Sequence, residues 1–84
     1  MVKRTIRNDI ISVFHELGET TLHLSQIYTQ VRIIRETRGV DIGDFDLLKA
    51  YIRWTLQNNP KSGRFIFVNI RKGSGMWAIR KRLY

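Results

Sequence analysis

Apolar side chains recur along the first part of the chain at the spacing of a helical face. Between residues 5 and 17 they follow intervals of four, three, one and three, at Ile6, Ile10, Val13, Phe14 and Leu17. Thr5 is a suitable N-cap for this helix, and Gly18 can end it. The next segment, residues 19–24, is short and contains β-branched residues, which favours a connecting extended segment or one short strand.

A second helix is predicted to follow this segment. Ser25 is expected to cap it, with Leu24 as the staple residue before the cap, and Gly39 is expected to close it. Its core positions are Ile27, Val31 and Ile34. The loop at 39–44 is acidic and contains two glycines, which separates this helix from the next.

A third helix is predicted from Asp44, a good N-cap, to about Asn58. Asn59-Pro60 is expected to stop it, because proline cannot continue a helix. Its inward positions are Phe45, Leu48, Ile52 and Leu56.

The pattern after Pro60 is typical of strands. Residues 65–70 are mostly aromatic or β-branched, and 76–79 return after the tip Arg71-Lys-Gly-Ser-Gly. The tip glycines can supply positive φ for a turn, and they can also bring backbone amides close to a phosphate. Both roles stay open, and Trp77 is expected in the core.

The order of predicted elements is helix, short strand, helix, helix, strand, strand, in one domain over residues 1–84. Three helices alone cannot bury the apolar residues well, and a hairpin packed against them would complete the core. The sequence therefore predicts an α+β winged helix, a three-helix helix-turn-helix core with a small antiparallel sheet. The wing is the C-terminal hairpin at about 64–80, and a basic tail follows at 80–84.

Charge is divided unevenly between the two parts of the chain. The net charge is +8; residues 1–48 hold six Lys or Arg and seven Asp or Glu, whereas residues 49–84 hold nine Lys or Arg and no acid. Soluble surfaces usually mix both signs. A segment without carboxylates attracts polyanions, although a solvated basic face is the plainer alternative.

The outward face of the third helix has the chemistry of a groove reader. Ala50 is small and permits close approach, Arg53 could bind guanine O6 and N7, Gln57 could bind adenine, and Lys49 could reach a phosphate. Trp54 lies on the same face, where packing against a neighbour, stacking on a sugar or thymine methyl, and anchoring a protein interface all remain open. The predicted nucleic-acid contacts are Lys49, Ala50, Arg53, Trp54, Gln57, Lys61, Arg64, Arg71, Lys72 and Ser74.

Other functional classes are disfavoured. The chain has no cysteine, which excludes disulfides and thiolate zinc sites, and its two histidines, His15 and His23, lack an obvious set of carboxylate partners. We expect no enzyme activity, cofactor, metal or small-molecule substrate. Charges interrupt the N-terminus before a signal-length apolar run, so we expect no membrane association and an intracellular location: cytoplasm or nucleoid if prokaryotic or viral, nucleus if eukaryotic.

Several segments between residues 6 and 80 resemble known winged-helix families. The stretch 18–28 (GETTLHLSQIY) is similar to the start of HARE-type helix-turn-helix domains attached to restriction and chromatin proteins, and 63–68 (GRFIFV) with 76–80 (MWAIR) to their end. The stretch 52–59 (IRWTLQNN) is similar to the end of a forkhead recognition helix. The asparagine and histidine that read bases in forkhead domains correspond to Ala50 and Trp54, so the resemblance implies a docking mode and not a forkhead sequence preference.

These observations favour double-stranded DNA binding without catalysis, in transcriptional regulation or a DNA-associated accessory role. The third helix would enter the major groove, and the wing tip would contact the backbone or minor groove. The main alternative is a protein-interaction or oligomerisation module, a homodimer or a heterocomplex, with Tyr51 and Trp54 as anchors. RNA binding is less favoured, because Phe65 and Phe67 resemble core residues more than an exposed stacking platform.

Overall fold

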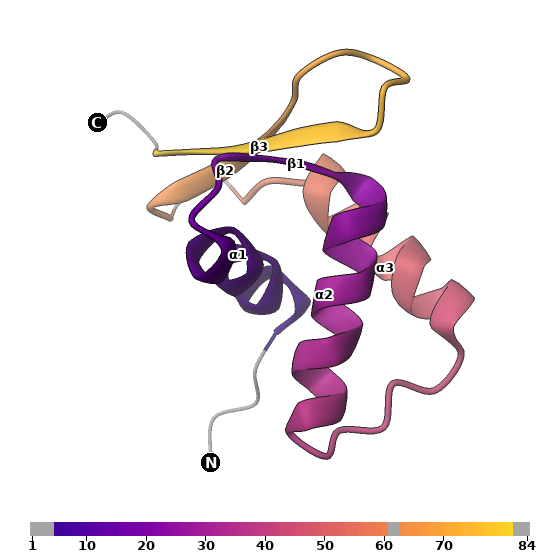
Figure 1. Cartoon of the computed structure of the whole chain (residues 1–84). Helices are drawn as coiled ribbons and strands as arrows, with labels where there is room; N and C mark the ends of the chain where they lie inside the picture. Colours follow the sequence, from indigo (N-terminus) through magenta and orange to yellow (C-terminus); the bar gives the residue numbers. More distant parts are fainter. Residues whose placement is uncertain (1–4, 61–62, 82–84) are drawn as a thin grey trace.

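The computed structural model describes residues 5–60 and 63–81, which form three helices and a three-stranded antiparallel sheet (Figure 1). The elements are α1 (Ile6–Leu17), β1 (Thr21–His23), α2 (Leu24–Thr37), α3 (Phe45–Gln57), β2 (Phe65–Asn69) and β3 (Met76–Lys81). Their order is the predicted one, and the α+β class is confirmed.

Helix α1 has the predicted ends. The Thr5 side chain accepts a hydrogen bond from the amide of Asn8 at 3.1 Å, and Gly18 closes the helix in the left-handed region at φ 66°. Ile10, Val13 and Phe14 are fully buried. The prediction for Leu17 was wrong: it lies on the last turn, beyond the reach of the core, and is exposed.

The predicted cap of α2 was also wrong. His23, and not Ser25, is the N-cap: its Nδ1 accepts from the Ser25 amide at 3.1 Å, and its own amide donates to Oε1 of Gln26 at 3.0 Å. This is a capping box in which an imidazole replaces the usual hydroxyl. The Ser25 hydroxyl lies 2.9 Å from the same Nδ1.

Helix α3 begins and ends as predicted. Asp44 accepts from the amide of Asp46 at 2.8 Å, and Asn58 is the C-cap. Leu48, Ile52 and Leu56 are buried, whereas Phe45 is half-buried at the start of the helix.

The sheet has the order β1-β3-β2, so β3 is central. Leu22 lies opposite Trp77, and Phe67 lies opposite Ile79. The Phe67 ring stacks on Phe14 of α1 with centroids 6.3 Å apart. Strand β3 runs two residues further than predicted, to Lys81, and β2 ends one residue earlier, at Asn69.

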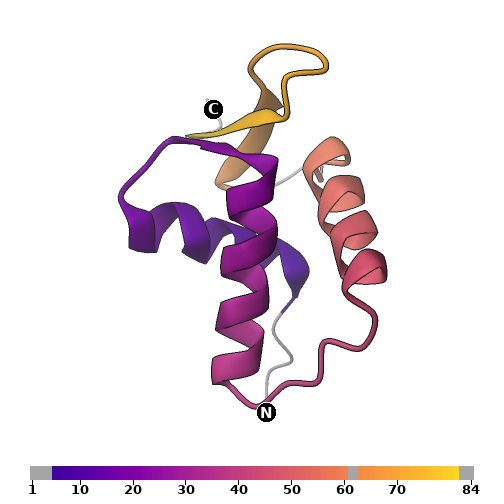
Figure 2. The same cartoon turned by 45° about the vertical axis from the view of Figure 1, so that its right-hand side comes forward.

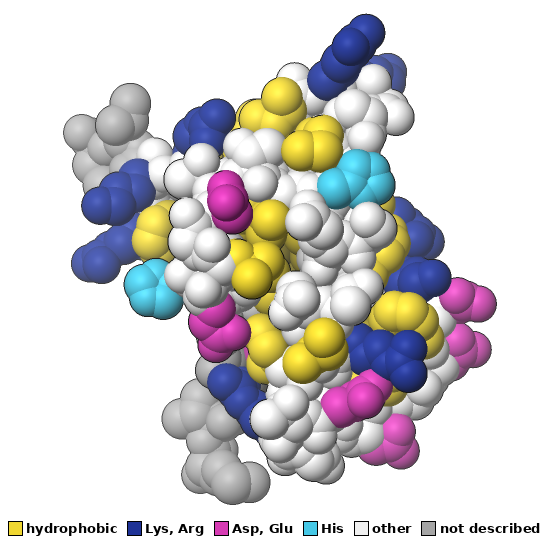
Figure 3. Space-filling view, in the orientation of Figure 1, with side chains coloured by type: hydrophobic (Ala, Val, Ile, Leu, Met, Phe, Trp, Pro, Cys, Tyr) yellow, Lys and Arg dark blue, Asp and Glu magenta, His cyan; other side chains and the backbone are white. Residues whose placement is uncertain are grey.

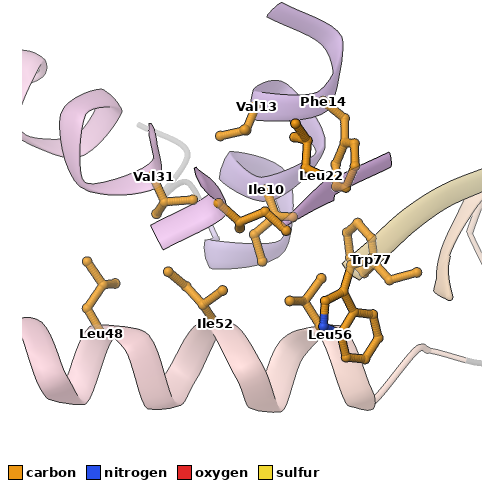
Figure 4. Close-up of a cluster of buried hydrophobic side chains, with 11 residues drawn as sticks. Ile10, Val13, Phe14, Leu22, Val31, Leu48, Ile52, Leu56 and Trp77 are labelled. Atoms are coloured by element: carbon orange, nitrogen blue, oxygen red, sulfur yellow. The ribbon is translucent and has the colours of Figure 1, made fainter. Parts of the chain in front are cut away.

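The core lies between the three helices and the inner face of the sheet. In Figure 4, Leu48, Ile52 and Leu56 project from one side of α3 toward Ile10 and Val31, and Trp77 closes the end of the cluster near Leu56. Trp77 was predicted in the core, and this is confirmed. Figure 2 shows the hairpin of β2 and β3 above the helices, with α3 beside α2 and α1 crossing behind. One side of α3 is thereby left open.

Candidate nucleic-acid interface

The open side of α3 carries the side chains predicted for it. Ala50, Arg53, Trp54 and Gln57 are exposed, and Lys49 is half-buried at the edge. At 100° per residue this side divides into two edges. Lys49, Arg53 and Gln57 form the edge toward α2, here termed the basic edge. Leu47, Ala50, Tyr51 and Trp54 form the other, here termed the apolar stripe.

Aromatic side chains of α2 and α3 contact the cations of the basic edge. Arg53 Nη1 donates a hydrogen bond to the Tyr28 hydroxyl at 3.0 Å. Lys49 Nζ lies 4.7 Å from the centroid of the Phe45 ring and 5.7 Å from that of Tyr28. The hydrogen bond holds Arg53 at the α2 side of α3, and the ring contacts hold Lys49 there, since a cation is attracted to the face of a ring.

Arg32 is a cation of this surface that sequence reasoning missed. Its guanidinium lies 4.8 Å from the centroid of Phe45, the ring that Lys49 also contacts, and its Nε donates to Glu36 at 2.5 Å. No periodicity could have indicated it, because Arg32 and Lys49 meet only through the packing of α2 on α3.

The two cations predicted at the hairpin tip lie on a turn that is closed by hydrogen bonds. Arg71 and Lys72 are exposed. Ser74 donates to the Arg71 carbonyl through its amide at 3.0 Å and through its hydroxyl at 2.6 Å, and the hydroxyl accepts from Met76 at 3.2 Å. The hydroxyl of Ser74, predicted as a nucleic-acid contact, is therefore used within the turn.

Several hydrogen bonds attach the hairpin to the helices: Arg7 of α1 donates to the Phe65 carbonyl, and two further attachments lie nearer the tip and α3. The Leu24 amide at the start of α2 donates to the Gly75 carbonyl at 2.7 Å. Beyond α3, the Asn59 side chain accepts from the Phe67 amide at 2.8 Å and donates to the Phe67 carbonyl at 2.9 Å, as a neighbouring strand would. Leu24 and Tyr28 are one helical turn apart and share a face. The tip and Arg53 are thus attached to the same end of α2.

Replacing Gly75 by alanine is expected to weaken this attachment. Gly75 has φ 74°, and a Cβ there would lie 2.9 Å from Nε2 of His23, the cap of α2. We expect a loss of about 2–3 kcal/mol of unfolding free energy, measured by urea denaturation. Gly73→Ala is the matched control, because Gly73 has φ 81° with nothing within 4 Å. Equal losses in the two variants would show that contact with His23 contributes nothing.

The remaining predicted residues do not join this group. Arg64 precedes β2 and lies at the open end of the hairpin, opposite the tip, since Phe65 pairs with Lys81 there. Arg80 and Lys81, expected in a basic tail, extend β3 at that same end. Lys61 and residues 82–84 lie outside the described residues.

Among the described residues, some cations are paired with acids, and others are not. In Figure 3, the Lys and Arg side chains at the top right, over the hairpin, have no Asp or Glu beside them, whereas over the rest of this face Lys or Arg and Asp or Glu are interspersed. Lys49 Nζ lies 3.9 Å from Oδ1 of Asp46. Within residues 5–60 and 63–81, no ion pair involves Arg53, Arg71 or Lys72.

The two histidines lie on different elements. His15 is exposed on α1, and His23 caps α2. The described residues contain no group of three or more His, Cys, Asp or Glu side chains that could hold a metal ion. Among these residues, no helix combines the length and apolar character needed to cross a bilayer.

Comparisons of the chain with protein-family models, with curated proteins and with solved structures found no match.

Proposed function

We propose that this chain is a winged-helix domain that binds double-stranded DNA without catalysis. The basic edge of α3 enters the major groove, and the tip of the β2–β3 hairpin contacts the phosphate backbone or the adjacent minor groove. An accessory or regulatory role on DNA follows from such binding.

The observation that carries the proposal is the common placement of Arg53, Arg71 and Lys72. Arg53 bonds to Tyr28 near the start of α2, and the hairpin tip that carries Arg71 and Lys72 is attached to the same end of α2 through Gly75. None of the three makes an ion pair within the described part of the chain. A cation without a carboxylate neighbour keeps its charge available for a phosphate. Residues 49–84 contain no acid that could compete.

The geometry of α3 supports the division of roles. Ala50 at the middle of the exposed side leaves room for base edges, and Arg53 and Gln57 offer the two-pronged contacts that suit guanine and adenine. The N-terminal end carries Asp44 and Asp46, which phosphates would repel. The end of α3 nearer the hairpin would therefore enter deepest.

Removal of the tip cations separates backbone contacts from base contacts. We expect Arg71→Ala with Lys72→Ala to lower affinity for all duplexes by about tenfold at moderate salt, and to reduce the log–log salt slope by about 2. Arg53→Ala is expected instead to relax preference at one base position, by about 1–3 kcal/mol. Fluorescence anisotropy on duplexes selected from a random pool, at stated salt, measures both.

A matched control is available on the same hairpin. Arg80→Ala with Lys81→Ala removes equal charge from the end opposite the tip. Its effect is expected to be clearly smaller. Equal weakening by the two double variants would mean that net charge alone governs binding, and unchanged binding in both the tip and Arg53 variants would overturn the proposed interface.

A further inference from the structure

The apolar stripe on α3 has no partner in the folded domain. Leu47 is 66% exposed, Tyr51 64% and Trp54 61%. Together with Ala50 they line a shallow hollow on the helix surface. Three large apolar side chains exposed side by side on one helix mark an interaction site, whereas isolated exposed apolar residues are ordinary.

The stripe continues beyond α3. Leu47 and Tyr51 also line a second hollow, whose other apolar members include Ile6 at the start of α1 and Ile42 in the loop before α3; Thr5 and Arg35 are its polar members. The apolar surface therefore spans two helices and a loop. The basic edge flanks it, with Arg53 about 110° around the helix from the centre of the stripe.

We propose that the stripe binds a second copy of this chain, with the two α3 helices antiparallel across a two-fold axis. Its members are spaced by three, one and three residues, the spacing of a helix-pairing seam. An axis between Ala50 and Tyr51 brings Leu47 opposite the partner's Trp54, and Ala50 opposite the partner's Tyr51. The small Ala50 leaves room for the larger ring, so the surface is complementary to itself.

The charges at the ends of α3 favour the antiparallel arrangement. Asp46 is 90% exposed near the start of the helix, and Arg53 is exposed near its end with no ion pair in the described part of the chain. In the antiparallel pair Asp46 comes within about two residues, or about 3 Å along the axis, of the partner's Arg53. A parallel pair would set like charges beside one another, and its helix dipoles would also repel.

Pairing competes with the DNA contact, a step that rests on the proposed function. Ala50 and Trp54 belong both to the stripe and to the predicted DNA-binding residues. Packed helices lie about 8–10 Å apart, whereas successive major-groove sites are about 34 Å apart. Two paired α3 helices thus cannot occupy neighbouring grooves, and pairing withholds them from DNA.

Sedimentation equilibrium without DNA tests the pairing directly. The chain has a mass of 10.0 kDa. Since the stripe is smaller than a standard interface of roughly 20–30 residues per side, we expect a shift from this mass to twice this mass with a Kd on the order of 10–100 μM. Leu47→Glu should weaken pairing at least about tenfold. The control is Ile33→Glu on α2, an exposed apolar residue outside the stripe, which should not.

Charge exchange tests the orientation. Asp46→Lys and Arg53→Glu should each weaken pairing, and the two together should restore it, with circular dichroism confirming the fold of each variant. A monomer mass up to about 500 μM, well above the expected Kd, would overturn the proposal. Pairing unaffected by Leu47→Glu would also overturn it, and failure of the double exchange to restore pairing would overturn the antiparallel arrangement. Because no DNA is present, these outcomes are independent of the proposed function.

Discussion

Affinity for duplex DNA is expected to fall about a thousandfold between roughly 50 and 200 mM salt. The basic edge and the hairpin tip, with the other cations of residues 49–84, make on the order of six phosphate contacts plausible. Each contact releases condensed counterions and contributes about −0.9 to the log–log slope, so the total slope is about −5. Anisotropy titrations at four or more salt concentrations give this slope directly.

Single-stranded DNA of the same length provides the comparison for this titration. Its lower charge density reduces the slope to about −0.7 per contact, and it lacks the groove into which α3 would fit. We expect weaker binding with a shallower slope. A flat titration on duplex DNA would remove the basis of the proposed function and favour a protein-interaction module.

The helices and the hairpin were predictable because their signals are local. Thr5 and Asp44 are strong caps, and apolar residues at helical spacing identified the buried faces. The cap of α2 was missed because histidine is not a typical cap residue. It acts as one here because its ring is held between Ser25 and the Gly75 turn, which is a tertiary arrangement.

The site was predictable only in part for the same reason. Exposure of Arg53 and Trp54 follows from the helical period. The hydrogen bond from Arg53 to Tyr28 and the contact of Arg32 with the Phe45 ring depend on how α2 packs on α3. Asn59 was expected only to stop a helix, yet it also pairs with the edge strand β2 at Phe67.

A buried carboxylate joins α1 to the end of α2. Asp9 is 1% exposed, and its Oδ2 accepts from Arg35 Nε at 2.7 Å, while Arg38 Nη1 lies 3.7 Å from Oδ1. Asp9 falls between Ile6 and Ile10 on the apolar face of α1, where a lone charge in the sequence marks a partner on another element. The pair holds α2 against α1, and α2 carries Tyr28 and Arg32, which contact α3.

Asp9→Ala is expected to lower the unfolding free energy by about 3 kcal/mol. The substitution leaves Arg35, whose side chain is only 19% exposed, without this carboxylate, and breaking a buried pair by removing one partner costs about 3–5 kcal/mol. The lower figure applies because Arg38 is 42% exposed and can return to water. For a domain of this size the midpoint of thermal unfolding should fall by about 12–24 °C.

Two controls identify the cause of the expected loss. Glu36→Ala removes an exposed pair with Arg32 on the same helix α2 and should cost only about 0.3–0.5 kcal/mol. Asp9→Leu with Arg35→Met replaces both charges by apolar groups of similar volume and should recover most of the stability. If Asp9→Ala cost no more than Glu36→Ala, the buried pair would not hold α2 in place. The alternative outcome is a double variant that regains its stability and still binds DNA more weakly. That result would show that the pair orients α2, whose Tyr28 contacts the basic edge, more than it stabilises the fold.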